Sequence, residues 1–192
     1  MPDLSGRFER ALVMAVRLHR NQNRKGTSVP YVAHLLGVCA IVLEHGGSEA
    51  EAIAALLHDA VEDQGGAATF ERIRRRFGEE VAAIVDACTD AWTVPKPPWK
   101  QRKLAYLERL PGEHGGALLV GAADKLYNLR SVVEAYREHG EAVWGRFAQG
   151  RDEQLWYFES VVAALRNTGR VPPALVGALE RELASLRELV RR

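Results

Sequence analysis

The residues most capable of chemistry are concentrated in one short run, Leu56-Leu57-His58-Asp59-Ala60-Val61-Glu62-Asp63. An imidazole and three carboxylates in an otherwise apolar helix are costly to bury unless they have partners. Glu62 and Asp63 also fall in the last turn of the expected helix, where the helix dipole disfavours negative charge by about 0.3–1 kcal/mol each. A bound cation would reverse that effect, and helical spacing brings His58 near Glu62 and Asp59 near Asp63. The run therefore indicates either a metal centre with carboxylates one turn away or a polar, solvated helix end.

Two further residues favour the metal centre. His34 interrupts an apolar helical face, although a single imidazole there is more often a hydrogen-bonded core residue than a ligand. Asp124 lies in the middle of an apolar run, so it needs either an ion or a charged partner such as Lys125. Asn128 follows Asp124 by one helical turn and shares its face. Two imidazoles and two carboxylates, with positions left for water, suit a catalytic Mn²⁺, Mg²⁺, Zn²⁺ or Fe²⁺.

Helices must position these residues, because apolar side chains recur at the i, i+3, i+4 and i+7 spacing almost throughout the chain. The predicted fold class is therefore all-α. The segment from Thr93 to Trp99 contains three prolines and is expected to form an irregular, exposed loop. In the first half of the chain the expected helices run from Ser5 to about His19, from Pro30 to Gly46, and from Ser48, in a capping box with Glu51, to about Asp63. A short helix capped by Thr69 and a helix introduced by Gly78 are expected to follow. The second half is expected to contain a basic helix from about Lys100 and helices over Leu118 to Tyr136, Asp152 to Leu165 and Pro173 to Arg192.

Length and charge restrict the class of protein. A chain of 192 residues with 47% hydrophobic content is expected to form one domain over residues 1–192, with a core of about 5–168 and a C-terminal amphipathic helix of about 172–191. With 26 Lys and Arg against 25 Asp and Glu, no overall field draws the chain to nucleic acid or to a membrane. The charged N-terminus lacks the apolar run of a signal peptide, and no later run has the length of a membrane span. These features predict a cytoplasmic protein.

The two cysteines and the last helix bear on compartment and assembly. Cys39 and Cys88 lie in apolar helical patterns and form no metal-binding pair, so they are interpreted as core thiols in a reducing compartment. Leucines recur along residues 175–190 in roughly heptad order. That face can pack on the body of the same chain or on a second subunit, which predicts a monomer or a homodimer.

The order of the four candidate ligands carries a family resemblance. His34, then His58-Asp59, then Asp124 resembles the H…HD…D signature of the HD-domain superfamily. The resemblance spans roughly Leu12 to Arg130, is looser to about Leu165, and is strongest to the hydrolase domain of RelA/SpoT-type proteins and the single-domain small alarmone hydrolases. The runs that carry it are Gln22-x-Arg24-Lys25, Pro30-Tyr31-x-x-His34, Ala55-Leu56-Leu57-His58-Asp59-x-Val61-Glu62-Asp63, Phe77-Gly78 and Asp124-Lys125-Leu126-Tyr127-Asn128-Leu129-Arg130.

This resemblance implies a fold and an activity. The fold would be a compact HD-domain helical bundle with an extra C-terminal helix, and the activity would be removal of the 3′-diphosphate from a guanosine or adenosine alarmone such as ppGpp or ppApp. A manganese ion would be held by the four candidate ligands. Glu62 and Asp63 would act on the attacking water, which suits carboxylates beside a metal that lowers the pKa of water. The residues expected to contact the nucleotide substrate are Arg24, Lys25, Asn128 and Ser131.

The sequence departs from the family pattern in three places. Leu35 stands where proline is common after the first histidine, and Gln64 stands where threonine is frequent beside the acidic pair. Gly121-Ala122 occupies the place of a usual Lys-Leu, which is expected to remove a cation and bulk from the pocket wall.

Other functions compete with alarmone hydrolysis. An HD-type nucleotidase would act on another nucleotide or deoxynucleotide, but the block from Arg24-Lys25 to His34 argues against it, although these two cations alone would be interpreted as solvated surface charge. A cyclic-nucleotide phosphodiesterase would need more histidine ligands, and the remaining histidines lie outside suitable motifs. A non-catalytic alarmone sensor would commonly lack the Glu62-Asp63 pair, which is intact here.

Overall fold

The computed structural model of the protein describes residues 3–93 and 95–191. Val94, in the expected proline-rich loop, and Arg192, at the expected end of the last helix, lie outside the described residues. The helices are α1 (Gly6–His19), α2 (Val32–Glu44), α3 (Glu49–Leu57), α4 (Ala60–Asp63), α5 (Gly66–Phe77), α6 (Glu79–Cys88), α7 (Trp99–Arg109), α8 (Gly115–His139), α9 (Gly150–Asn167) and α10 (Pro173–Arg191), with 3₁₀ segments at Leu110–Gly112 and Gly140–Arg146. The predicted all-α class is confirmed. Within the described residues the only β-pairing is an isolated antiparallel bridge between Asn23 and Pro30.

Two predicted helix starts are confirmed by their caps. The Ser5 side chain accepts a hydrogen bond from the amide of Arg7 at 3.1 Å at the start of α1. At the start of α3, Ser48 and Glu51 form a reciprocal capping box, with bonds of 3.2 and 2.7 Å between side chains and backbone amides. Each cap satisfies amides that a helix N-terminus otherwise leaves unpaired, which contributes about 1 kcal/mol.

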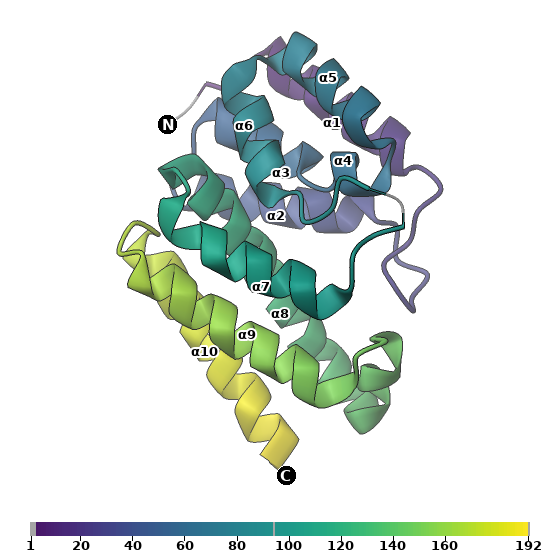
Figure 1. The fold of residues 1–192 in the computed structure, drawn as a ribbon, viewed down its shortest axis with the longest axis vertical. Coiled ribbons are helices and arrows are strands. Elements are labelled where there is room, and N and C mark those ends of the chain that lie inside the picture. Colours follow the sequence, from purple (N-terminus) through teal and green to yellow (C-terminus); the bar gives the residue numbers. More distant parts are fainter. Residues whose placement is uncertain (1–2, 94, 192) are drawn as a thin grey trace.

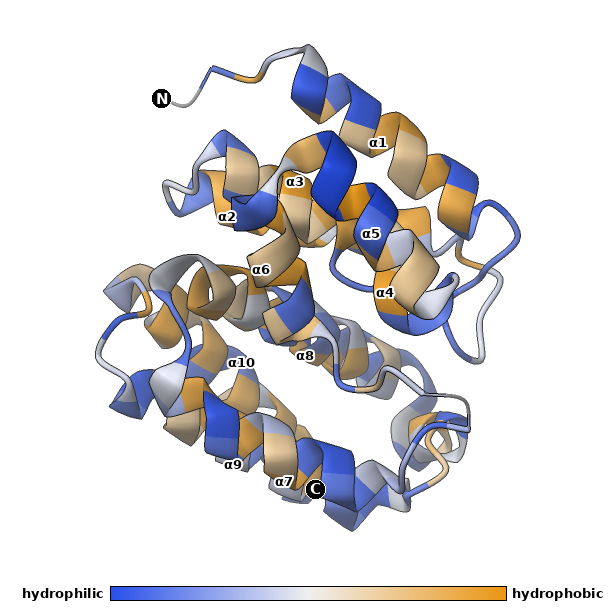
Figure 2. Ribbon diagram, turned by 45° about the horizontal axis from the view of Figure 1, so that its top comes forward, coloured by the Kyte–Doolittle hydropathy of each residue, from blue (hydrophilic) through white to orange (hydrophobic). Residues whose placement is uncertain are grey.

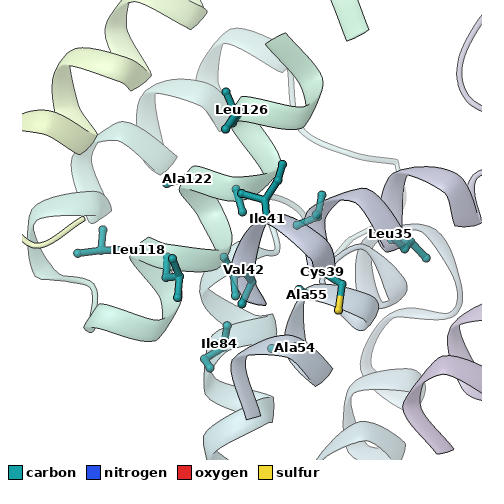
Figure 3. Close-up of a cluster of buried hydrophobic side chains, with 14 of the residues drawn as sticks. Leu35, Cys39, Ile41, Val42, Ala54, Ala55, Ile84, Leu118, Ala122 and Leu126 are labelled. Carbon is teal, nitrogen blue, oxygen red and sulfur yellow. The ribbon is translucent and has the colours of Figure 1, made fainter. Parts of the chain in front are cut away.

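The long helix α8 runs through the middle of the molecule and joins two groups of helices (Figure 1). Helices α1 to α6 lie on one side of it, and α7, α9 and α10 lie on the other (Figures 1 and 2). Apolar faces of these helices turn inward, as the hydropathy colouring shows (Figure 2). The buried cluster where α2, α3, α6 and α8 meet includes Ile41, Val42, Ala55, Ile84 and Leu126 (Figure 3), all at most 4% exposed. This packing anchors the helices that carry the candidate ligands.

The last helix packs within the chain. Leu175, Leu179, Leu183 and Leu186 of α10 are buried against α8 and α9, so of the two packing partners considered for this face the structure shows the body of the same chain. Burying one such leucine contributes roughly 1.5–3 kcal/mol. Among the residues that the structure describes, no helix is both long and apolar enough to cross a membrane.

The third expected helix is divided, which corrects the prediction of one helix from Ser48 to Asp63. Helix α3 ends at Leu57 and α4 begins at Ala60, because Asp59 has φ −94° and ψ −2°, well away from the values of about −63° and −42° in a regular α-helix. Adjacent residues of a continuous helix point about 100° apart. The interruption instead lets His58 and Asp59 direct their side chains to one centre.

A second correction concerns the next helix. The hydroxyl of Thr69 donates to the carbonyl of Gln64 at 2.6 Å, but Thr69 lies inside α5 and is not its N-cap. Helix α5 already begins at Gly66, because Gly65 adopts the left-handed conformation, with φ +112°, and reverses the chain directly after α4. Sequence-based prediction placed the start of this helix at Thr69 and so missed its earlier start at Gly66.

Candidate active site

Four side chains from distant parts of the chain converge on one point. The Nε2 atoms of His34, from α2, and His58, from the break after α3, lie 3.3 Å apart. Oδ2 of Asp59 is 3.4 Å from Nε2 of His34 and 2.9 Å from Nε2 of His58. Oδ1 of Asp124, from α8, is 3.3 and 3.7 Å from the same two nitrogens. The structure thus brings together all four residues that the sequence singled out as metal ligands.

The spacing of these atoms suits a shared divalent cation. Ligand atoms about 2.0–2.2 Å from one ion in tetrahedral or octahedral geometry stand about 3–3.5 Å apart, close to the spacings observed. The ligand atoms of His34, His58 and Asp59 lie within 4.8 Å of one another. Both imidazoles are buried, at 1% and 3% exposure, so solvent does little to satisfy the charges gathered there. The donor set of imidazole and carboxylate fits a catalytic transition-metal or magnesium ion.

Neighbouring polar groups orient three of the four side chains, those of His58, Asp59 and Asp124. Nδ1 of His58 donates to the carbonyl of Ala55 at 2.8 Å, which leaves Nε2 free as a ligand. The Tyr31 hydroxyl donates to Oδ2 of Asp59 at 2.6 Å, and burial together with Asp59 raises the pKa of Tyr31, so it remains a donor. The amide of Asn128 donates to Oδ1 of Asp124 at 2.6 Å.

Lys125 was the alternative partner considered for Asp124, and it does pair with that residue. Its Nζ lies 2.6 Å from Oδ2 of Asp124, whereas Oδ1 faces the two imidazoles. Burial lowers the pKa of Lys125, but Asp124 together with Tyr157, Tyr106 and Asp90 outweighs burial and raises it, so the ammonium persists. The two oxygens of Asp124 therefore serve different partners, and the lysine does not displace the candidate cation.

The charges of the candidate ligands depend on one another. Burial raises the pKa of Asp59, but His58 and His34 outweigh it and hold that pKa well below its usual range. Burial likewise raises the pKa of Asp124, and Lys125 followed by the two histidines lowers it. Burial lowers the pKa of His58, and Asp59 and Asp124 raise it well above its usual value. The two carboxylates thus attract positive charge to a buried point, as a cation site requires.

Glu62 and Asp63 lie beside this centre, held by a cation from the proline-rich loop. Nζ of Lys96 is 2.9 Å from Oε1 of Glu62 and 3.0 Å from Oδ1 of Asp63. Glu62 also accepts from the amide of Asp90 at 3.2 Å, and Asp63 accepts from the side chain of Gln22 at 2.9 Å. These donors offset the unfavourable helix dipole, and the pair does not belong to the four converging side chains.

A cavity of about 320 Å³ opens on three of the four candidate ligands, His34, Asp59 and Asp124, and on the acidic pair. Ser131 does not line it, but Ser131 does line an adjoining cavity of about 830 Å³. Among the described residues, three predicted substrate contacts line both cavities: Arg24, Lys25 and Asn128. The two cavities therefore form one cleft, wide enough for a nucleotide at one end and containing the candidate metal centre at the other.

Arg24 is placed between the two cavities by aromatic and polar contacts. Its guanidinium carbon lies 5.9 Å from the ring centre of Tyr31 and 5.8 Å from that of Tyr127. One of its nitrogens donates to Oδ1 of Asn128 at 2.8 Å. The loop that carries it is closed by a bond of 2.8 Å from its amide to the carbonyl of Val29. Arg24 is thus ordered before any ligand binds, whereas Lys25 is exposed.

Sequence reasoning missed several residues of the cleft. Lys96 lies 33 and 34 residues after the acidic pair in an irregular loop, so no periodicity connects them. Three further residues line the smaller cavity: Asp90 from the loop after α6, Lys103 from α7 and Tyr157 from α9. Lys103 forms an ion pair with Asp90 and lies 4.9 Å from the ring centre of Tyr157. Tyr31 stood within a recognised run but without a role, and only its contact with Asp59 reveals one.

The departure at Gly121-Ala122 has a different consequence from the one expected. In the described part of the chain neither residue lines the cleft, and both are buried in α8. A Cβ at residue 121 would lie 2.7 Å from the hydroxyl of Tyr106, so glycine makes room for that ring. The ring in turn faces Nζ of Lys125 at 4.7 Å. The substitution therefore changes packing between α7 and α8, and the pocket wall loses no cation at these positions.

Comparison with known proteins identifies the family. A family model described as an HD domain matches residues 11–152. The chain belongs to the HD-domain family. Its histidine and aspartate ligands, acidic pair and central α8 all lie within the matched range. The HD-type resemblance expected from the ligand order is confirmed.

Relatives and a solved structure indicate which HD-domain proteins this chain resembles. A Xenopus tropicalis protein named guanosine-3′,5′-bis(diphosphate) 3′-pyrophosphohydrolase MESH1 is 39% identical over 160 residues, covering 82% of this chain and 83% of that protein. A Drosophila melanogaster protein of the same name is 33% identical, covering 85% and 87%. A solved structure described as a metazoan ortholog of SpoT that hydrolyses ppGpp has a TM-score of 0.80 and 30% identity, covering 98% of this HD-domain chain and 99% of that chain. These matches confirm the predicted likeness to single-domain alarmone hydrolases.

Proposed function

We propose that this HD-domain protein is a metal-dependent phosphohydrolase that removes the 3′-diphosphate from a guanosine or adenosine alarmone such as ppGpp or ppApp. The observation that carries the proposal is the convergence of His34, His58, Asp59 and Asp124 at one end of a nucleotide-sized cleft. Relatives named for this activity cover most of the chain and support the choice of substrate class.

The four converging residues are proposed to hold one divalent cation, with Mn²⁺ as the first choice and Mg²⁺, Zn²⁺ or Fe²⁺ as alternatives. When bound, the cation would supply Lewis acidity toward the phosphoryl group and the attacking water. The chain supplies the orientation: Tyr31 and Asn128 hold the two carboxylates, and Ala55 holds the imidazole of His58. This support keeps the ligands in place before substrate arrives.

Glu62 and Asp63 are proposed to orient the attacking water and receive its proton. Their carboxylates line the same cavity as the ligands but bond to Lys96 and Gln22. The water oxygen would attack the phosphorus joined to the 3′ oxygen, the bond between that phosphorus and the 3′ oxygen would break, and the 3′ oxygen would take a proton. The products would be a nucleoside 5′-phosphate species and pyrophosphate.

The larger cavity is proposed to hold the nucleoside part of the substrate. Arg24 offers a planar donor face between two tyrosine rings, where a base can stack and a phosphate can accept. Lys25 would add a flexible charge at the cleft edge, and Asn128 and Ser131 would offer hydrogen bonds from α8. The sharing of three of these residues between the two cavities supports one substrate spanning both.

The proposal also covers the domain organisation, location, assembly and partners of the enzyme. We infer a single domain over residues 1–192, a cytoplasmic location, action as a monomer or homodimer, and a small-molecule nucleotide as the partner, with neither nucleic acid nor membrane. The burial of the apolar face of α10 against α8 and α9 supports the inclusion of the last helix in that domain.

A turnover screen tests the function. The protein, loaded with Mn²⁺, is offered ppGpp, pppGpp, ppApp and deoxynucleoside monophosphates, and pyrophosphate and orthophosphate are followed separately. The expected result is pyrophosphate release from the alarmones alone. Orthophosphate release from deoxynucleotides would make the protein a nucleotidase, and tight alarmone binding without turnover would make it a sensor.

A further inference from the structure

A second cavity lined by charged groups lies between α1 and α5 and shares no lining residue with the cleft in the described chain. The two helices run side by side (Figures 1 and 2). Near one end they are tied by Arg7, whose guanidinium donates to the carbonyl of Phe77 at 2.7 Å. The cavity has a volume of about 400 Å³, enough for a small organic anion. We refer to it as the α1/α5 groove.

The groove is lined by four arginines: Arg10, Arg17, Arg72 and Arg76. Glu9 is its only acidic lining residue, so the local formal charge is about +3 although the whole chain carries +1. Ion pairs between side chains are abundant elsewhere on this surface, as in Arg74 with Glu71 at 2.8 Å. None of the four groove arginines has a carboxylate within 4.0 Å in the described residues.

Arg72 provides the second observation. Its Nε atom is buried and has no hydrogen-bond partner in the described structure. A buried guanidinium donor without an acceptor is costly, because desolvation is not repaid. Basic residues interact favourably with a helix C-terminus, which explains why an arginine stands at position 76 in the last turn of α5. That interaction does not explain Arg72, which lies a turn earlier, or Arg10 in the body of α1.

The spacing of the arginines indicates the size of the missing anion. Arg10 and Arg17 lie two turns apart on α1, a rise of about 10 Å, and Arg72 and Arg76 lie one turn apart on α5. Two linked phosphates offer acceptor oxygens over a greater length than one phosphate does, which suits arginines distributed along this length of helix. Val13, 46% exposed, and Met14 provide apolar surface in the same groove, which a nucleoside could cover.

We propose that the α1/α5 groove binds a diphosphate-bearing anion, either free pyrophosphate or a nucleoside diphosphate, at a site separate from the catalytic cleft. The guanidinium forks of Arg10, Arg17, Arg72 and Arg76 hold the phosphates. The acceptor for Nε of Arg72 is a phosphate oxygen. This proposal needs no catalysis and does not depend on the proposed function.

Amide hydrogen exchange locates the binding. The probes are inorganic pyrophosphate and GDP, added to the full-length protein in physiological salt with chelator present. The expected result is slower exchange over residues 10–18 and 72–77, in addition to any change around the cleft. If pyrophosphate and GDP bind with equal affinity, the groove recognises the diphosphate alone and its ligand is pyrophosphate. If GDP binds more tightly, the nucleoside contributes and the ligand is a nucleoside diphosphate. Absence of protection in both segments overturns the proposal.

A pair of matched variants tests the residues. R72Q with R76Q removes two groove charges, and R20Q with R75Q removes two exposed charges from the same part of the surface that do not line the groove. The groove variant is expected to lose protection in both segments, with affinity for the probe there reduced about tenfold or more, whereas the control variant keeps both. Equal weakening in the two variants would show non-specific attraction by surface charge and overturn the proposal. Circular dichroism of both variants verifies that the helices persist.

Discussion

The two pairs of carboxylates in the cleft are held in contrasting ways. Asp59 and Asp124 are bonded by Tyr31 and Asn128, which belong to the helical body of the protein, and face two buried imidazoles. Glu62 and Asp63 share the ammonium of Lys96, which comes from an irregular loop. The first pair is built into the fold, so its loss should affect stability. The second pair is held largely by groups outside the helical body, so its loss should affect chemistry far more than stability.

The largest effect is expected from His58→Ala, which removes a buried ligand. The remaining ligands cannot complete the metal centre, so both bound metal and turnover should fall to background. Because a cation offsets the repulsion of Asp59 and Asp124, the variant should also lose the rise in melting temperature that Mn²⁺ gives the wild type. Metal analysis, turnover and thermal unfolding with and without Mn²⁺ measure these effects. If the variant is active and has normal metal content, His58 is not a metal ligand.

The next largest effect is expected from Glu62→Gln combined with Asp63→Asn. The amides keep the volume of the side chains and still accept hydrogen bonds from Lys96 and Gln22. Metal content, fold and nucleotide affinity should persist, while the single-turnover rate falls about 10²–10⁴-fold because positioned proton transfer is lost. A rate within a few-fold of the wild type would mean that the water is activated elsewhere. Loss of the metal would make these carboxylates ligands.

A smaller effect is expected from Arg24→Gln combined with Lys25→Gln, at the nucleoside end of the cleft. Each charged hydrogen bond lost costs about 1.5–3 kcal/mol of binding, so KM for a tetraphosphate substrate should rise tenfold or more. The melting temperature should hardly change, because Lys25 is exposed and Arg24 has a single side-chain bond, to Asn128. Steady-state kinetics and thermal unfolding separate the outcomes. A large loss of stability with unchanged KM would make these cations structural.

The smallest effect is expected from Gly37→Ala, in the part of α2 that faces Tyr127. A Cβ at residue 37 would lie 1.9 Å from Cε2 of Tyr127, so the ring must move. That ring lies 5.1 Å from the ring centre of His34 and 5.8 Å from the guanidinium of Arg24. The expected cost is about 1–3 kcal/mol of stability, with a modest rise in KM. Urea unfolding measures it, and the cost should shrink in a Tyr127→Ala background, where the space is free.

The sequence predicted those parts of the site whose residue types and spacing follow a helical pattern. His34, His58, Asp59 and Asp124 lie at turns of amphipathic helices, so their residue types and order indicate one centre before the fold is known. The break at His58-Asp59 escaped prediction because the apolar periodicity continues through it. The break directs the His58 and Asp59 side chains to one point, which local helix propensity does not report.

The contacts made across long sequence separations could not be predicted. Lys96 reaches Glu62 from a proline-rich loop, and Asp90 pairs with Lys103 across the start of α7. Neither pair belongs to a periodic pattern, and lysines on a basic helix are usually solvated. Only the packing of α7 and its preceding loop over the end of α4 brings these charges into the cleft.

Hydrolysis of ppGpp in ¹⁸O-labelled water tests the central claim most directly. The protein loaded with Mn²⁺ converts ppGpp in this water, and mass spectrometry determines which product carries the label. If water attacks the phosphorus next to the 3′ oxygen, pyrophosphate gains one ¹⁸O, the nucleoside diphosphate gains none, and His58→Ala yields neither product. Label at the 3′ oxygen, or orthophosphate in place of pyrophosphate, would contradict the proposed reaction.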